Sequence, residues 1–136
     1  MQPNVFSYNC ALEAWSKSGE KDAAVRAAII LQRLLKRRDM KPDTYSFNQV
    51  LLAISRSSLP HAAESAKKWL DFMDTSYSKG IYPRASPDLV SYLAVVSSYA
   101  RSGISGAASR AEEVFRTLHE KYRRGRKDLK PNRYIY

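Results

Sequence analysis

The hexapeptide Pro42-Asp43-Thr44-Tyr45-Ser46-Phe47 recurs along this chain in slightly altered form. Its other copies are PNVFSY at residues 3–8, PDLVSY at 87–92 and a truncated PNRYIY at 131–136. The prolines at positions 3, 42, 87 and 131 lie 39, 45 and 44 residues apart. Self-similarity at a period of a few tens of residues is the sequence signature of a stacked repeat protein. The chain therefore divides into units at residues 5–43, 44–88 and 89–132, with the start of a fourth at 133–136.

Each unit is predicted to open with a helix of about 13 residues, because apolar side chains recur there in steps of four and three. An Asn or Asp follows each proline, where an N-cap accepts hydrogen bonds from the first turn. Gly19 and Gly103 fit the positions that end such helices. The apolar stripes are Tyr8, Leu12 and Trp15; Phe47, Leu51 and Ile54; and Tyr92, Val96 and Tyr99. The N-cap candidates are Asn4, Asp43, Asp88 and Asn132.

A second helix is predicted in each unit, over residues 23–38, 61 to about 78, and about 107 to 124. Its apolar stripe cannot be buried within one hairpin, so units must stack on their neighbours. The expected fold is therefore all-α, a right-handed α-solenoid of stacked helix-turn-helix repeats. The first helices would line an inner surface and the second helices would lie outside.

The composition limits the function classes. The chain has 23 Lys and Arg against 13 Asp and Glu, a net charge of +10. This charge is about equally compatible with two interpretations, a chain that binds a polyanionic partner and a basic protein with no nucleic-acid role. No apolar run approaches the roughly 18 residues that span a bilayer, so no membrane partner is expected. One cysteine and two histidines build neither a disulfide nor a zinc site, and no metal or cofactor is expected.

The chain carries no recognisable catalytic motif, and we expect it not to be an enzyme. His61 follows Pro60 at a predicted helix start, and His119 lies in a basic helix. Neither has a nucleophile at a fixed spacing. Cys10 is expected to be a small buried residue rather than a nucleophile.

The order of these signals resembles the pentatricopeptide repeat. Pro-Asp/Asn is followed by Ser-Tyr-Asn, a helix ending in a basic residue with Ser-Gly, Ala at the head of a second helix, and Gly-x-x-Pro. The resemblance covers residues 3–136. Tetratricopeptide repeats are the nearest alternative, but their Trp-x-x-Leu-Gly pattern is absent. These units are longer than the family's, and the extra residues, including 83–87, fall outside the first helices.

The resemblance implies binding of single-stranded RNA, one base per repeat, read by two or three side chains. The implied base-reading pairs are Asn9 with Asp43, Asn48 with Asp88, and Leu93 with Asn132. Asn with Asp favours uridine in this family, whereas Leu93 offers no hydrogen bond and departs from the pattern. The alternative is that these Asp and Asn residues serve as N-caps, and both roles can coexist.

Two further sets of residues complete the predicted RNA surface. The family holds each base between side chains at the second position of adjacent first helices, which implies Phe6, Tyr45, Val90 and Tyr134. These residues could instead fill the core between units. A basic residue stands thirteenth in every unit, and the three in register suit a phosphate track. They are Lys17, Arg56 and Arg101; ordinary pairing with a helix C-terminus is the alternative.

The resemblance implies a role in RNA processing, stability or translation in a mitochondrion or chloroplast, although no targeting leader is visible. We expect the chain to be a block of a longer array. Two other functions stay open. One is a helical-repeat scaffold for protein partners. The other is the RNA-recognition part of an enzyme, such as a protein-only ribonuclease P, whose catalytic domain lies outside this chain.

Overall fold

The computed structural model describes residues 4–124, which form six α-helices and no strand. The all-α prediction and its two-helix pattern are confirmed over these residues. Residues 132–136, predicted to begin a further helix, lie outside the described part. The helices are α1 (Val5–Lys17), α2 (Ala23–Leu35), α3 (Thr44–Ser55), α4 (Ala62–Ser78), α5 (Leu89–Ser102) and α6 (Ala107–Arg123).

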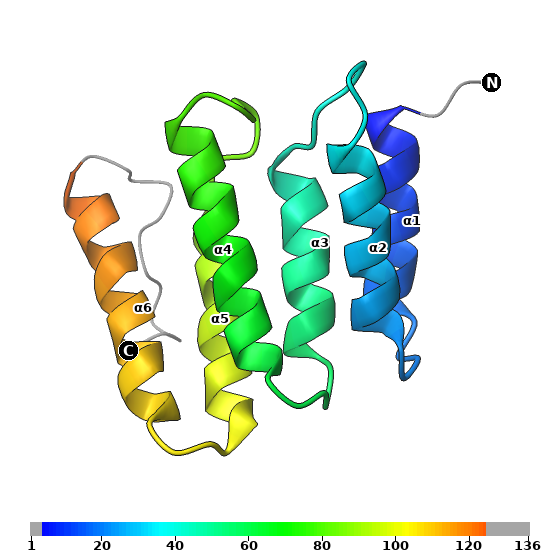
Figure 1. The fold of residues 1–136 in the computed structure, drawn as a ribbon. Coiled ribbons are helices and arrows are strands. Elements are labelled where there is room, and N and C mark those ends of the chain that lie inside the picture. The colour runs from blue at the N-terminus through cyan, green and yellow to red at the C-terminus, as the bar shows by residue number, and fades with distance from the viewer. Residues whose placement is uncertain (1–3, 125–136) are drawn as a thin grey trace.

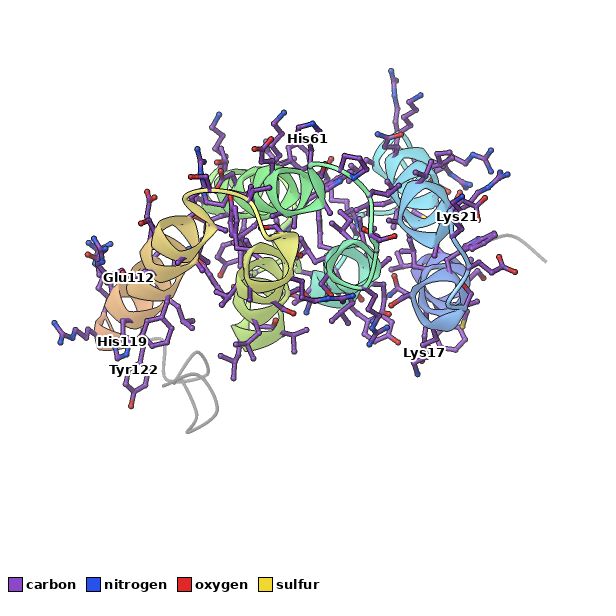
Figure 2. All side chains as sticks on the ribbon, turned by 90° about the horizontal axis from the view of Figure 1, so that it is seen from below. Lys17, Lys21, His61, Glu112, His119 and Tyr122 are labelled. Carbon is purple, nitrogen blue, oxygen red and sulfur yellow. The ribbon has the colours of Figure 1, made fainter. Side chains whose placement is uncertain are left out.

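The helices pack in pairs, and the pairs stand side by side (Figure 1). Within the units α1 packs on α2, α3 on α4, and α5 on α6. Between units α3 contacts both α1 and α5, and it also contacts α2. Seen along the helices, α1, α3 and α5 form one row, while α2 and α4 lie in a second row (Figure 2). We call these the first-helix row and the second-helix side.

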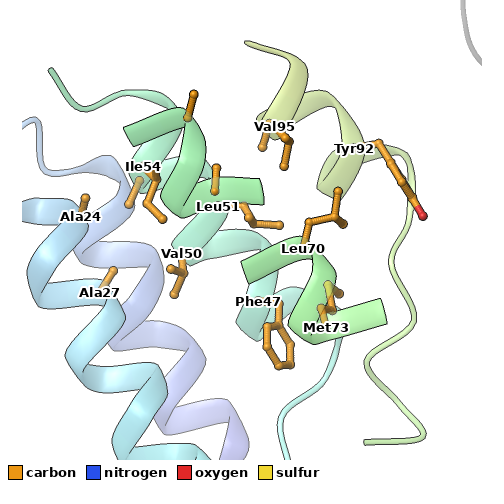
Figure 3. Close-up of a cluster of buried hydrophobic side chains, with 14 of the residues drawn as sticks. Ala24, Ala27, Phe47, Val50, Leu51, Ile54, Leu70, Met73, Tyr92 and Val95 are labelled. Carbon is orange, nitrogen blue, oxygen red and sulfur yellow. The ribbon is translucent and has the colours of Figure 1, made fainter. Parts of the chain in front are cut away.

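The core lies between the two rows and runs without a break from one unit to the next (Figure 3). The predicted apolar stripes supply much of it, which is what removal of apolar surface from water favours. In the middle unit Phe47, Leu51 and Ile54 are all buried. In the first unit only Leu12 of its stripe is fully buried. The middle unit is packed on both sides, and this accounts for its more complete burial.

The three first helices begin in the same way. Asn4, Asp43 and Asp88 are N-caps, as predicted, and each accepts a hydrogen bond from the backbone N–H of a serine three residues later. That serine's side chain in turn accepts from the N-cap backbone, which completes a capping box. Their lengths of 13, 12 and 14 residues match the prediction.

The second helices begin differently from one another. Asp22, His61 and Gly106 are their N-caps, and none makes a side-chain capping hydrogen bond. His61 has φ of 62°, a left-handed conformation that is uncommon outside glycine. The predicted bounds were close at both ends of α6, but α2 ends at Leu35 rather than at residue 38.

The insert before the third unit folds back onto the second. The backbone N–H of Thr44 donates to the Arg84 carbonyl at 3.0 Å, and its hydroxyl donates to the Ser86 carbonyl at 2.7 Å. Ala85 between them is fully buried. The additional residues therefore cover the start of α3 rather than projecting away. No helix of the described residues is both long and apolar enough to cross a bilayer.

Candidate nucleic-acid interface

A hydrogen-bonded group of Asn, Asp and Ser lies at the junction of α1 and α3. Asn9 Nδ2 donates to Asp43 Oδ1 at 3.2 Å. Ser46 Oγ donates to Asn9 Oδ1 at 2.6 Å. Asp43 also accepts from the Ser46 backbone N–H at 3.0 Å, because it is the N-cap of α3. The first predicted base-reading pair is thus brought together, and the carboxylate has a structural role as well.

The same group recurs at the junction of α3 and α5. Asn48 Nδ2 donates to Asp88 Oδ1 at 3.0 Å, and Ser91 Oγ donates to Asn48 Oδ1 at 2.6 Å. Asp88 caps α5 and accepts from the Ser91 backbone N–H at 3.2 Å. The second predicted pair is therefore also in contact. We refer to the two groups as the Asn-Asp-Ser triplets.

Both triplets hold the amide in one orientation. The serine hydroxyl has a single proton, and the shorter contact assigns it to the amide oxygen, so the amide nitrogen must face the carboxylate. Asn9 and Asn48 are only 8% and 6% exposed. Each amide still has a second N–H and a second lone pair, which is the hydrogen-bonding capacity that a base edge requires. Ser46 and Ser91 were not assigned to this site from the sequence, although their recurrence in the hexapeptide could have identified them.

The third predicted pair is not completed in the described residues. Leu93 occupies the position of Asn9 and Asn48 and is half-buried. Its predicted partner Asn132 lies outside the described part of the chain. α5 therefore offers an apolar side chain where the other two first helices offer an amide.

The predicted stacking residues are exposed. Phe6 is 74% exposed, and Tyr45 and Val90 are each 41% exposed. None of them is buried between units, which was the alternative interpretation. Tyr134 lies outside the described residues. Burial in the core therefore does not account for the apolar side chains at this place in the three units.

Glu13 joins one stacking residue to one basic residue. Its carboxylate accepts from Lys17 Nζ at 2.7 Å. Hydrogen bonds from Lys17 and then from Tyr45 hold the pKa of Glu13 below its usual value. The same bond to Glu13, followed by partial burial, raises the pKa of Tyr45. Glu13 thus lies between Tyr45, a predicted base-stacking residue, and Lys17, a predicted phosphate contact.

The predicted phosphate residues have two different roles in the structure. Lys17 is exposed and points from α1 away from the second-helix side (Figure 2). Arg56 instead donates from Nη1 to the carbonyl and hydroxyl oxygens of Ser16 at 2.9 and 3.0 Å. Arg101 donates from Nη1 to the carbonyl of Ser55. Both arginines therefore satisfy the C-terminal end of the preceding first helix, a contact between units that sequence reasoning did not anticipate.

Each arginine keeps the N–H groups of Nε and Nη2, because only Nη1 contacts the preceding helix and a guanidinium has five N–H groups. A phosphate contact is compatible with this geometry for both. Lys17 can contact a phosphate if it gives up its ion pair with Glu13.

The prediction that Cys10 is buried is wrong, because its side chain is exposed. Gln49 and Ala94 occupy the same place in α3 and α5 and are buried. Each of those helices packs against a preceding first helix, whereas α1 has none in the described part of the chain. Cysteine is a residue type that is usually buried, but no preceding first helix covers this position of α1 in the described part of the chain.

The histidines lie apart from each other and from the first-helix row. His61 Nδ1 is 3.4 Å from Glu64 at the start of α4, and the ring of His119 packs edge-on against Phe115 at 4.9 Å. Figure 2 shows His61 on the second-helix side. Within residues 4–124 no group of His, Cys, Asp and Glu side chains is arranged to hold a metal ion.

Comparison with known proteins adds no assignment to this geometry. No protein-family model, curated protein or solved structure matches this chain.

Proposed function

We propose that this chain is a stretch of right-handed α-solenoid of the pentatricopeptide type, and that its first-helix row binds single-stranded RNA. The observation that carries the proposal is the Asn-Asp-Ser triplet, formed twice with the same geometry. Exposed apolar side chains flank both copies. Capping alone accounts for the Asp and the Ser, but it requires neither the Asn nor the exposed ring beside it.

In the proposed complex each amide hydrogen-bonds to one base edge. A base over Asn9 would lie between Phe6 and Tyr45, and a base over Asn48 between Tyr45 and Val90. The carboxylate of Asp43 or Asp88 fixes the amide from behind. The first two units should then prefer two adjacent uridines, and the third, with Leu93, should be less selective.

Lys17, Arg56 and Arg101 would contact phosphates along the same row. The net charge of +10 supports an anionic ligand. The proposed role is non-catalytic recognition of RNA in a mitochondrion or chloroplast, within a longer array. Binding of a protein is the second candidate function, and an apolar hollow between α2 and α4 favours it.

The test is to titrate the chain against labelled oligo-U, oligo-A and oligo-C at low salt. Three stacked bases supply about 3–9 kcal/mol, against an association cost of about 4–15 kcal/mol, so the chain alone should bind weakly or not measurably at physiological salt. Low salt is used because it strengthens the phosphate contacts. Tyr45→Ala should weaken binding roughly 5- to 150-fold, since one stacked base contributes about 1–3 kcal/mol. The matched control is Tyr77→Ala, which removes a similarly exposed ring from α4. Equal effects of the two substitutions would contradict the proposed surface.

Base choice is tested separately with Asn48→Ser. This change should shift the preference at one base position while the helical circular dichroism is retained. Unchanged preference for uridine at that position would show that Asn48 serves only the contact between units.

A further inference from the structure

A second surface lies on the opposite side of the molecule. α2 and α4 both pack on α3, and two hollows lie between them. One has a volume of about 390 Å³ and the other about 150 Å³. Ser65 and Trp69 line both, so the two hollows adjoin each other. We call this surface the α2–α4 groove.

The floor of the groove is apolar and partly open to solvent. Val25 and Phe72 line it and are 48% and 43% exposed. Trp69 packs edge-on against Phe72 at 6.1 Å, and Phe72 also lies 6.1 Å from the buried ring of Phe47. The half-exposed Phe72 and the partly buried Trp69 thus both rest on the buried ring of Phe47. Rigid, partly exposed aromatic side chains in a hollow are typical anchors of protein interfaces.

Basic residues predominate on the α2 side of the groove, whereas α4 carries both signs, including Glu64, which lies 3.4 Å from His61. Residues 23–38 include five basic residues and no acidic one. Lys68 lines the groove, and Lys36 follows Gln32, a lining residue, by one helical turn. Neither lysine has an ion-pair partner among residues 4–124. In contrast, Asp71 and Asp74 of α4 are paired, with Lys67 and Lys121 respectively.

From this pattern we propose that the α2–α4 groove binds an acidic amphipathic helix of a partner protein. The groove runs along α2 from Ala24 to Leu35, which is roughly 17 Å or three helical turns. A partner helix of that length presents apolar side chains at i, i+3, i+4 and i+7 to the floor. Its carboxylates then meet Lys36 and Lys68, which also selects against basic partners.

Other occupants fit less well. Single-stranded RNA requires cations along its phosphates, but the lining contains one lysine among mostly apolar residues. A second copy of this chain would bring two strongly basic surfaces together. Because the groove and the first-helix row lie on opposite sides, a protein helix and an RNA strand could be bound at once (Figure 2). The inference does not depend on the RNA proposal.

The test uses a labelled helical peptide of about 14 residues, with Leu at the i, i+3, i+4 and i+7 spacing and Glu elsewhere. Two control peptides have the same composition in scrambled order, or Lys in place of Glu. The first peptide should bind the chain at least about tenfold more tightly than either control. Lys68→Glu should weaken its binding several-fold, whereas Lys21→Glu, a surface charge reversal on the α1–α2 connection, should not. Phe72→Ala should abolish binding, with circular dichroism as the check on folding.

Four results would overturn the proposal. The first is equal affinity for the acidic peptide and its scrambled control. The second is the same response to Lys68→Glu and Lys21→Glu. The third is displacement of the peptide by oligo-U, which would identify the groove as a polyanion site. Self-association in sedimentation experiments that Phe72→Ala removes would also overturn it, in favour of a second copy. The effect of Tyr45→Ala on RNA binding tests the first-helix row and is read separately from these four outcomes.

Discussion

The first helices and the second helices of this protein differ in how closely they repeat. α1, α3 and α5 share an N-cap, a capping box, an exposed apolar residue and a C-terminal basic residue. α2, α4 and α6 share an apolar stripe, an Ala-Ala start and a basic C-cap, but their N-caps differ and are an aspartate, a left-handed histidine and a left-handed glycine. The difference has a physical origin. First helices meet at junctions that must have the same geometry each time, whereas a second helix needs only to cover the core.

The middle of the first-helix row should be most sensitive to mutation. Phe47 is 1% exposed and its ring contacts those of Trp69, Phe72 and Tyr82. Phe47→Ala should lower the free energy of unfolding by about 3–5 kcal/mol, because it leaves a cavity between the rows. Phe72→Ala, at a half-exposed ring of the second-helix side, is the control. Urea denaturation measures both, and equal losses would remove the distinction between the two sides.

N-caps of the two helix sets should respond differently. Asp43→Ala removes the capping bond of α3 and the partner of the buried Asn9 amide. We expect a loss of about 1–3 kcal/mol in the free energy of unfolding. Asp22→Ala at the start of α2 should cost less than half as much, because Asp22 makes no capping bond. Thermal unfolding of both variants tests this, and a larger loss for Asp22→Ala would contradict it.

The basic residues that stand thirteenth in their units should separate into two classes. Arg101→Gln loses the bond to the Ser55 carbonyl and should destabilise the protein by about 1 kcal/mol. Lys17→Gln affects only an exposed pair with Glu13 and should leave stability almost unchanged. In RNA titrations Lys17→Gln should still reduce the salt dependence, since each phosphate contact contributes about −0.7 to the log–log slope. An unchanged slope would leave Lys17 without a phosphate role.

The smallest expected effect concerns the acid between Tyr45 and Lys17. The pKa of Glu13 is lowered by hydrogen bonds from Lys17 and Tyr45. A folded-state pKa below the unfolded value means that the stabilisation is present above the unfolded pKa and is lost as pH falls through the folded value. Lys17→Gln and Tyr45→Phe should each raise the pKa of Glu13 towards its ordinary value, as measured by NMR titration of the carboxyl carbon. A pKa that neither substitution moves would show that these bonds do not form in solution.

The sequence by itself determined the helices and their pairing. Proline, an Asn or Asp N-cap and Ser at N3 specify a helix start locally, and steps of three and four residues specify the buried face. The pairs Asn9–Asp43 and Asn48–Asp88 are not among these features, because they were expected only from the resemblance to the pentatricopeptide repeat. These features depend on near neighbours in sequence, or on a spacing that the repeat itself displays.

The tertiary structure alone decided what depends on stacking and on the second helices. Arg56 reaches a carbonyl 40 residues away, which no local pattern encodes. Cys10 is exposed only because no first helix packs before α1 in the described chain. The α2–α4 groove exists because both helices rest on α3 and leave Trp69 and Phe72 partly uncovered. An amphipathic pattern marks the face that a helix buries, but how completely its neighbours cover that face is set by packing geometry.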